Sequence, residues 1–165
     1  MRIVHAGRLV VLCGVVAALL PAVQAKAAVD AYMTVNGVKQ GPIKGEAMSD
    51  NIKLVSVVRD TPMAARVAAG RRMHSTITIT KEVDAASPKF ATALVSNETL
   101  KTVAITFEGG SGDAKTAQKI VLTNATILSV RKAGGNEQIT LDYQAIEVTW
   151  VNGGKTAMDD WNAPS

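Results

Sequence analysis

Cysteine and histidine are scarce in this chain of 165 residues, which has one cysteine and two histidines. The cysteine is Cys13, so no disulfide can form within the chain, and residues 26–165 lack a thiolate nucleophile and a cysteine metal site. Beyond residue 25 the only histidine is His74. One histidine among scattered carboxylates is too small a donor set for a transition-metal site. We therefore expect no metal and no other cofactor.

Clustered positive charge is also missing. Lys and Arg number 18 against 14 Asp and Glu, and removing residues 1–25 takes away Arg2 and Arg8, which leaves a net charge of +2. A nucleic-acid-binding domain gathers Lys and Arg on one face. The densest basic spot here is the pair Arg71-Arg72, which argues against a nucleic-acid partner.

The only long apolar run lies near the N-terminus, where Leu9–Leu20 follows Arg2 and Arg8 and ends at Pro21. Twelve apolar residues are too few to span a bilayer, which takes about 20. The small residues of Val23-Gln24-Ala25 complete the pattern of a cleavable signal peptide over residues 1–25. Cleavage after Ala25 is the first choice and after Ala27 the second. The position of Cys13, behind Leu12, disfavours a lipid anchor.

Alternating apolar and polar residues predict a single, mostly β domain over residues 26–165, with a short C-terminal tail. The expected strands are 29–35, 52–59, 73–80, 102–107, 120–123, 126–131 and 138–151. Residues 41–45 are expected to be irregular because of their glycines and proline, and the segment TPMAARVAAG at 61–70 is expected to be a long loop. The strands at 120–123 and 126–131 are expected to bend around Asn124-Ala125.

One helix is predicted after Ser87. Ser87 is placed as its N-cap and Pro88 at its first position. Its apolar face is expected to consist of Phe90, Ala91, Leu94 and Val95, with Asn97 as the stop.

The apolar phase changes within residues 138–151. Ile139, Leu141 and Tyr143 occupy odd positions, whereas the apolar residues from Ile146 to Trp150 occupy even ones. Such a shift marks a bulge or a strand that passes between two sheets. The fold class predicted is a compact β-barrel of two curved sheets with one α-helix.

Catalytic patterns are weak throughout. His74 falls on the Thr-rich polar side of its strand with no nucleophile motif beside it. GGSGD at 109–113 lacks the ending of a phosphate-binding loop, and the adjacent Asp159-Asp160 do not have the spacing of a glycosidase pair. These observations favour a protein that is not an enzyme and that works through its surface.

The residues ITKEVDAASPKF at 79–90 closely resemble the segment that joins the third strand to the helix in the Hcp family. These haemolysin-coregulated proteins are tube subunits of the type VI secretion system. Further segments resemble the family in order along the chain; they are 29–38, 71–74, 120–125, 139–150 and 153–161. Two departures stand out. Residues 43–58 lack an Asp…His…Trp pattern associated with many members, and tube subunits normally assemble in the cytoplasm without a cleavable signal.

The resemblance implies a Hcp-like β-barrel with one helix, and six copies in a ring with a wide channel. Rings stack head-to-tail into a tube, which carries small effectors and works with spike and sheath proteins. The motif residues carried over are Lys81, Asp84, Ser87 and Pro88. The loop expected to stack rings contains Thr61, Pro62, Met63, Ala64, Arg66 and Gly70.

Two other functions stay open on the sequence. The signal peptide favours a periplasmic or secreted Hcp-like barrel repurposed as a ligand- or protein-binding module, with no stable membrane insertion after cleavage. An exported hydrolase built on His74 is the third hypothesis, and an undiminished activity in the His74→Ala variant would remove it.

N-terminal sequencing of the protein made in its own cells tests the export signal. We expect the first residue to be Lys26, because the signal peptidase recognises the small residues of Val23-Gln24-Ala25. A start at Ala28 would identify the second cleavage position instead. An intact Met1 would contradict export through the general route.

Overall fold

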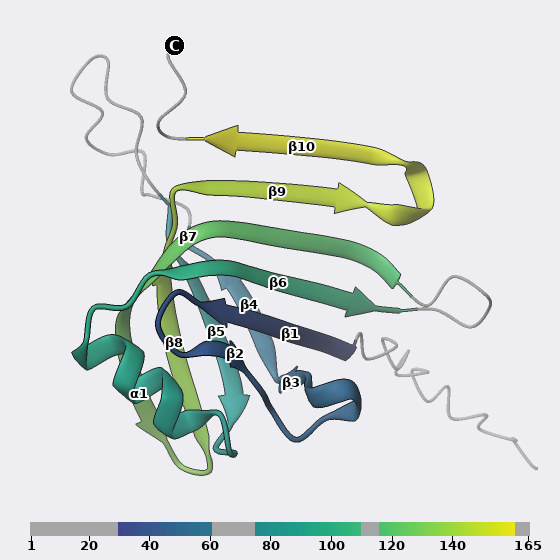
Figure 1. The fold of residues 1–165 in the computed structure, drawn as a ribbon. Coiled ribbons are helices and arrows are strands. Elements are labelled where there is room, and N and C mark those ends of the chain that lie inside the picture. The colour runs from purple at the N-terminus through teal and green to yellow at the C-terminus, as the bar shows by residue number, and fades with distance from the viewer. Residues whose placement is uncertain (1–29, 61–74, 110–115, 161–165) are drawn as a thin grey trace, which may run out of the picture.

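The computed structural model describes residues 30–60, 75–109 and 116–160 (Figure 1). These residues form antiparallel strands, one α-helix and two short 3-10 turns. In chain order they are β1 (Asp30–Gly37), β2 (Gly41–Ile43), η1 (Met48–Asp50), β3 (Ile52–Leu54), β4 (Ser56–Arg59), β5 (Ile77–Glu82), α1 (Ser87–Val95), β6 (Leu100–Glu108), β7 (Thr116–Ala133), β8 (Asn136–Asp142), β9 (Ala145–Trp150), η3 (Val151–Gly153) and β10 (Lys155–Asp160).

Two curved sheets share the long strand β7. The first half of β7 pairs with β6 and β9, and its second half pairs with β8. The first sheet therefore has the order β10-β9-β7-β6-β1, with β2 and β3 both on the outer side of β1. The second sheet has the order β7-β8-β5-β4. At the bend Asn124 has a φ of 49°, a left-handed conformation that asparagine tolerates better than most residues.

The hydrophobic core lies between the two sheets. It follows from the period-2 alternation, since every second residue of β1, β5 and β8, and of β6 from Val103, faces inward. Ile79, Ile105, Leu122 and Ile139 are completely buried. The predicted fold class is thus confirmed, although among the described strands hydrogen bonds do not close the barrel.

Helix α1 packs against β7, and Phe90 and Ala93 are buried on its inner side. Figure 1 shows the helix at one end of the sheets. The predicted stop is confirmed: Asn97 has a φ of 47° and its N–H donates to the carbonyl of Leu94 at 3.2 Å. The N–H of Glu98 donates to the carbonyl of Ala93 at 2.8 Å, which completes a Schellman C-cap.

Two details of the predicted helix are wrong. Ser87 is the first helical residue rather than the N-cap, because its hydroxyl group is engaged elsewhere. Ala91 and Val95 are exposed, because the turn of α1 brings Ala93 rather than these residues onto β7.

Several strand boundaries differ from the prediction. Residues 41–43, expected to be irregular, form β2 because the Asn36–Gly37 end of β1 offers free pairing positions. The expected strand 52–59 is divided at Val55, where the chain leaves β1 and joins β5. The expected strand 138–151 is two strands, and the chain does pass between sheets at Tyr143-Gln144. The expected pair at 120–131 is one bent strand, and β10 was not predicted at all.

Within residues 30–60, 75–109 and 116–160, every helix is too short or too polar to cross a bilayer.

Candidate functional site

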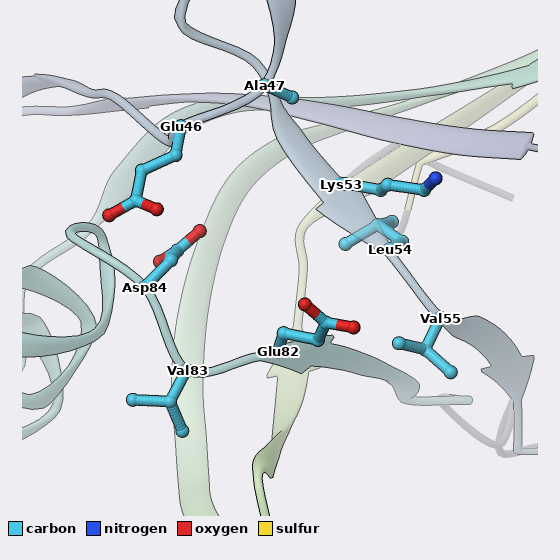
Figure 2. A pocket seen from close by; sticks show the side chains of 8 residues that line it. All are labelled: Glu46, Ala47, Lys53, Leu54, Val55, Glu82, Val83 and Asp84. Atoms are coloured by element: carbon cyan, nitrogen blue, oxygen red, sulfur yellow. The ribbon is translucent and has the colours of Figure 1, made fainter.

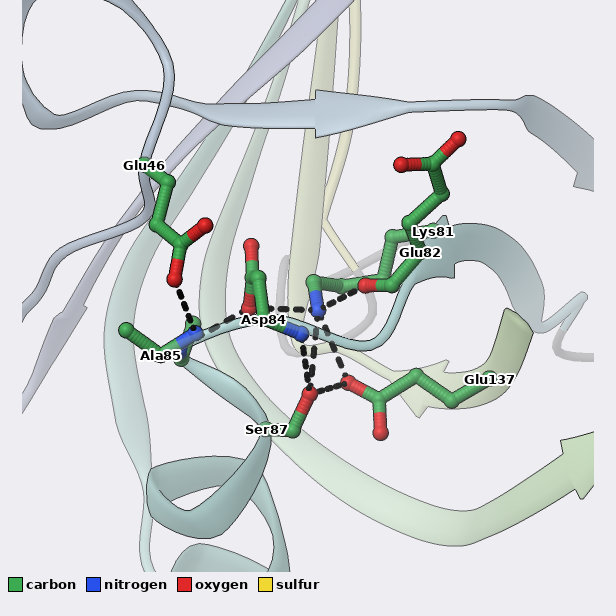
Figure 3. Close-up of polar contacts among 8 residues, drawn as sticks. Glu46, Lys81, Glu82, Asp84, Ala85, Ser87 and Glu137 are labelled. Carbon is green, nitrogen blue, oxygen red and sulfur yellow. Dashed lines mark hydrogen bonds and ion pairs between the residues drawn. The ribbon is translucent and has the colours of Figure 1, made fainter. Parts of the chain in front are cut away.

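A buried lysine joins the second sheet to the start of α1 (Figure 3). Lys81 follows Ile77 and Ile79 on the inward side of β5 and is completely buried. Directly opposite on β8, in register with it, lies Glu137, which is also completely buried. Their Nζ and Oε1 atoms are 2.9 Å apart. An unpaired charge at this depth would be very costly, so each of the two requires the other.

The turn between β5 and α1 supplies the other partners of Lys81. Its Nζ donates to Asp84 Oδ1 at 2.7 Å, to the carbonyl of Glu82 at 2.6 Å and towards Ser87 Oγ at 3.2 Å. It also lies 6.0 Å from the ring centre of Phe90, within the range of a cation–π contact. The ammonium group therefore has more acceptors around it than it has protons.

Asp84 and Ser87 in turn fix the backbone that leads into the helix. The Oδ1 atom of Asp84 accepts from the N–H of Ala86 at 2.8 Å, and Ser87 Oγ accepts from the N–H of Asp84 at 3.1 Å. The Ser87 hydroxyl donates to Glu137 Oε1 at 2.7 Å. These bonds hold the turn, β8 and the first residue of α1 in one network.

This network is structural rather than catalytic. A lysine beside a serine can form a nucleophilic dyad, and Nζ and Oγ are close enough here. A general base, however, needs a free lone pair, and Nζ of Lys81 faces two carboxylates instead. Neither Lys81 nor Ser87 offers substrate a surface, because both side chains are buried.

A second buried carboxylate, Glu98, holds the β1–β2 turn against the end of α1. Its Oε1 accepts from the N–H groups of Lys39 at 2.7 Å and Gln40 at 2.8 Å. Its Oε2 accepts from the side-chain amide of Gln40 at 2.9 Å. A Cβ on Gly37 would collide with Glu98 Oε1, so the close approach requires glycine there.

The pKa of Glu98 results from two opposed effects. Burial by itself would raise it, since a low-dielectric surrounding disfavours the charged form. The hydrogen bonds from Gln40 and Lys39 outweigh burial and lower the pKa below its ordinary value of 4.5. The folded protein therefore favours the ionised carboxylate.

An open pocket of about 320 Å³ lies beside the Lys81 network (Figure 2). One wall is Glu82 at the end of β5 with Val83 and Asp84 after it, and the other is Lys53 and Leu54 of β3 with Val55 after them. Glu46 and Ala47 complete the lining. Three carboxylates, one ammonium group and the apolar side chains of Ala47, Leu54, Val55 and Val83 line it. The only ammonium group, that of Lys53, lies 3.5 Å from Asp30.

The structure brings three of the four predicted motif residues together. Lys81, Asp84 and Ser87 share one network, whereas Pro88 is exposed and takes no part in it. The proposed stacking loop 61–70 and His74 lie outside the described residues. Sequence reasoning missed Glu137, Glu98 and the pocket; an inward-facing lysine on β5 was the one available sign that a buried acid had to exist. Within the described ranges no cluster of three metal-ligating side chains occurs.

The family model described as "Type VI secretion system effector, Hcp" matches residues 32–150. This span is well over half of the chain. The chain belongs to the Hcp family. The resemblance found in the sequence is therefore confirmed, and the matched span contains the Lys81 network, Glu98 and the pocket.

Individual relatives agree with the family assignment. The "Major exported protein" of Pseudomonas aeruginosa is 28% identical in an alignment 170 positions long, which covers 83% of this chain and 98% of the relative. Among solved structures, the secreted protein Hcp3 of P. aeruginosa has a TM-score of 0.70 and 26% identity, over 82% of this chain and 100% of that one. A variant of Hcp1 from the E. coli EAEC 042 pathovar has a TM-score of 0.71 at 22% identity, with the same coverage.

Lys81→Met tests the buried network. We expect a loss of about 3–5 kcal/mol in the free energy of unfolding, because Glu137 is left buried without its counter-ion. The double variant Lys81→Met/Glu137→Leu should recover much of this loss, since it removes both buried charges. The exposed Lys53→Met is the matched control, with a change within about 0.5 kcal/mol. Equal losses in Lys81→Met and Lys53→Met, measured by urea unfolding, would contradict the account.

Glu98→Gln tests the second carboxylate through pH. A carboxyl group whose pKa is lower in the folded than in the unfolded state stabilises the fold when the pH is above the unfolded pKa. This stabilisation is lost as the pH falls through the folded pKa. We expect Glu98→Gln to be less stable than the parent at pH 7 and the difference to shrink below about pH 4.5. Urea unfolding at a series of pH values measures it, with Glu108→Gln as a control for net charge. A difference that stays constant down to pH 3 would refute the assignment.

Proposed function

We propose that this protein is a non-enzymatic tube subunit of a type VI secretion system, which forms six-copy rings that stack and carry effectors. The observation that carries the proposal is the extent of the match. The Hcp fold covers 82% of this chain and the full length of the solved relatives, with no additional described domain that would bring another activity.

Ring closure requires two different patches on each subunit, one complementary to the other. Both sheets end in a strand that pairs on one side only among the described residues, β10 in the first sheet and β4 in the second. Unpaired strand edges are sites for pairing with another chain. Exposed apolar side chains lie at both: Met158 on β10 and Val58 on β4. These two edges supply the unlike surfaces that a six-fold ring uses.

A channel wall is available on the outer face of the first sheet. Residues that face away from the core lie in register across β1, β6, β7, β9 and β10. One row holds Tyr32, Thr106, Lys119, Thr149 and Thr156, and another holds Asn36, Thr102, Thr123, Ala145 and Asp160. These two rows are mostly polar, with few charges of either sign. The row between them has apolar members, namely Ala104, Val121 and Met158, beside Thr34 and Glu147. A channel wall of this chemistry suits folded effectors of varied sequence, because it offers hydrogen bonds without a strong electrostatic field.

A second candidate function is a periplasmic or secreted barrel that binds a ligand or a protein. The observation that favours it is the predicted export signal at residues 1–25, which would separate the chain from a cytoplasmic sheath and spike. In that case the protein is monomeric and the open pocket beside Glu82 is the binding site. A curated relative is itself named an exported protein, which supports a location outside the cytoplasm for either function.

Size-exclusion chromatography with light scattering separates the two functions. The tube-subunit proposal expects a particle of six times the subunit mass, since the two unlike edges close a ring. Native mass spectrometry of the same fractions should give the mass of six copies and no series of other copy numbers. A strict monomer at high protein concentration would rule out ring assembly and favour the binding module.

A further inference from the structure

The pocket beside the Lys81 network carries an inference that rests on the proposed ring. We propose that this acidic pocket is the receptor for an arginine of residues 61–74 from a second copy, in the adjacent stacked ring. The ligand class is a guanidinium group on an apolar stem.

The chemistry of the pocket suits such a group. The carboxylates of Glu46, Glu82 and Asp84 line it with the apolar side chains of Leu54, Val55 and Val83 (Figure 2). Carboxylates bind the planar guanidinium group by paired hydrogen bonds, and its methylene stem packs on apolar surface. Val55 and Val83 are 58% and 46% exposed, which leaves that surface accessible.

The pocket has an excess of negative charge. Asp84 is compensated by the buried Lys81 at 2.7 Å, and Lys53 lies against Asp30. Glu82 has no ion-pair partner in the described part of the chain. Glu46 is exposed, and among the described residues its carboxylate accepts only from the backbone N–H of Ala85, at 3.2 Å. Two exposed carboxylates therefore remain for an incoming cation.

The chain itself supplies a complementary segment. Residues 61–74 contain three arginines, Arg66, Arg71 and Arg72, and no aspartate or glutamate. The same segment has the apolar residues Met63 and Val67. Charge complementarity thus pairs this stretch with the pocket.

The topology favours an occupant from another copy. Strands β4 and β5 pair antiparallel, with Arg59 opposite Ile77 at one end and Ser56 opposite Thr80 at the other. The segment 61–74 leaves and rejoins the hairpin at the Arg59 end, since the N–H of Asp60 donates to the carbonyl of Thr76. The pocket lies at the opposite end, beyond Val55 and Glu82. A six-residue strand is about 20 Å long. In the proposed stack the copies repeat along this hairpin, so that one copy's segment meets the next copy's pocket.

Disulfide crosslinking between two single-cysteine proteins tests the contact. All variants are full-length and have Cys13→Ser. We expect Val55→Cys to form mixed disulfides with Ala65→Cys or Gly70→Cys, which flank Arg66 and Arg71, because thiols link only at Cα separations below about 7 Å. Val95→Cys is the matched control, since Val95 is 87% exposed but lies on α1. If neither segment cysteine links to Val55→Cys above the Val95→Cys level, the inference is wrong.

A charge exchange tests the chemistry. Crosslinking should drop at least tenfold when the pocket has Glu46→Lys/Glu82→Lys, or when Arg66, Arg71 and Arg72 are all changed to Glu. It should return when a pocket variant is mixed with a segment variant, because each then meets the opposite charge. Glu108→Lys is the control for net charge. Failure of the mixture to recover, with both proteins folded, would contradict an ionic contact between copies.

Two further outcomes are separable. A chain with both Val55→Cys and Ala65→Cys that closes only within itself would place its own segment in the pocket and overturn the second-copy assignment. If the protein forms six-copy particles but Val55→Cys does not crosslink to the segment cysteines, this inference alone is wrong. If the parent protein does not form six-copy particles at all, the proposed function is wrong.

Discussion

Burial of a charged pair between β5 and β8 is the constraint on which this fold depends. Lys81 and Glu137 face each other at the end of the core where both sheets and the helix come together. Since neither charge can reach water, the backbone around them is built to supply partners: the carbonyl of Glu82, the carboxylate of Asp84 and the hydroxyl of Ser87. A hydrophobic pair would give similar stability. The ionic pair also constrains geometry, because the contacts of Glu137 Oε1 with Lys81 and Ser87 need one register of β5, β8 and the turn before α1.

The turn between β5 and α1 links the buried pair to the molecular surface. The turn that supplies Asp84 to the buried lysine also supplies Glu82 and Val83 to the pocket. One side of the turn is therefore fixed by the core, while the other side is solvent-facing and free to vary in chemistry. At the far end of the helix Glu98 has a similar role, since its carboxylate ties the turn after β1 to the helix terminus. Two buried acids hold the two ends of α1.

Local patterns predicted much of the fold because their causes are local. The alternation in 30–35 and 77–80 identified the inward face, and Asn97 ended the helix as a residue that tolerates positive φ. Other features depend on contacts that are distant in sequence. Glu137 lies 56 residues from Lys81, and only the β5–β8 register reveals the pair. Strand β10 was missed because all but its last two residues are exposed and it alternates weakly; its pairing with β9 makes it a strand.

The strand β7 belongs to both sheets through one unbroken backbone. Its halves are held by β6 and β9 on one side of Asn124 and by β8 on the other. One sheet consequently cannot slide along the other without breaking backbone hydrogen bonds of β7. A force applied to one sheet is passed to the other along the peptide chain itself. The shared strand therefore opposes shear between the two layers.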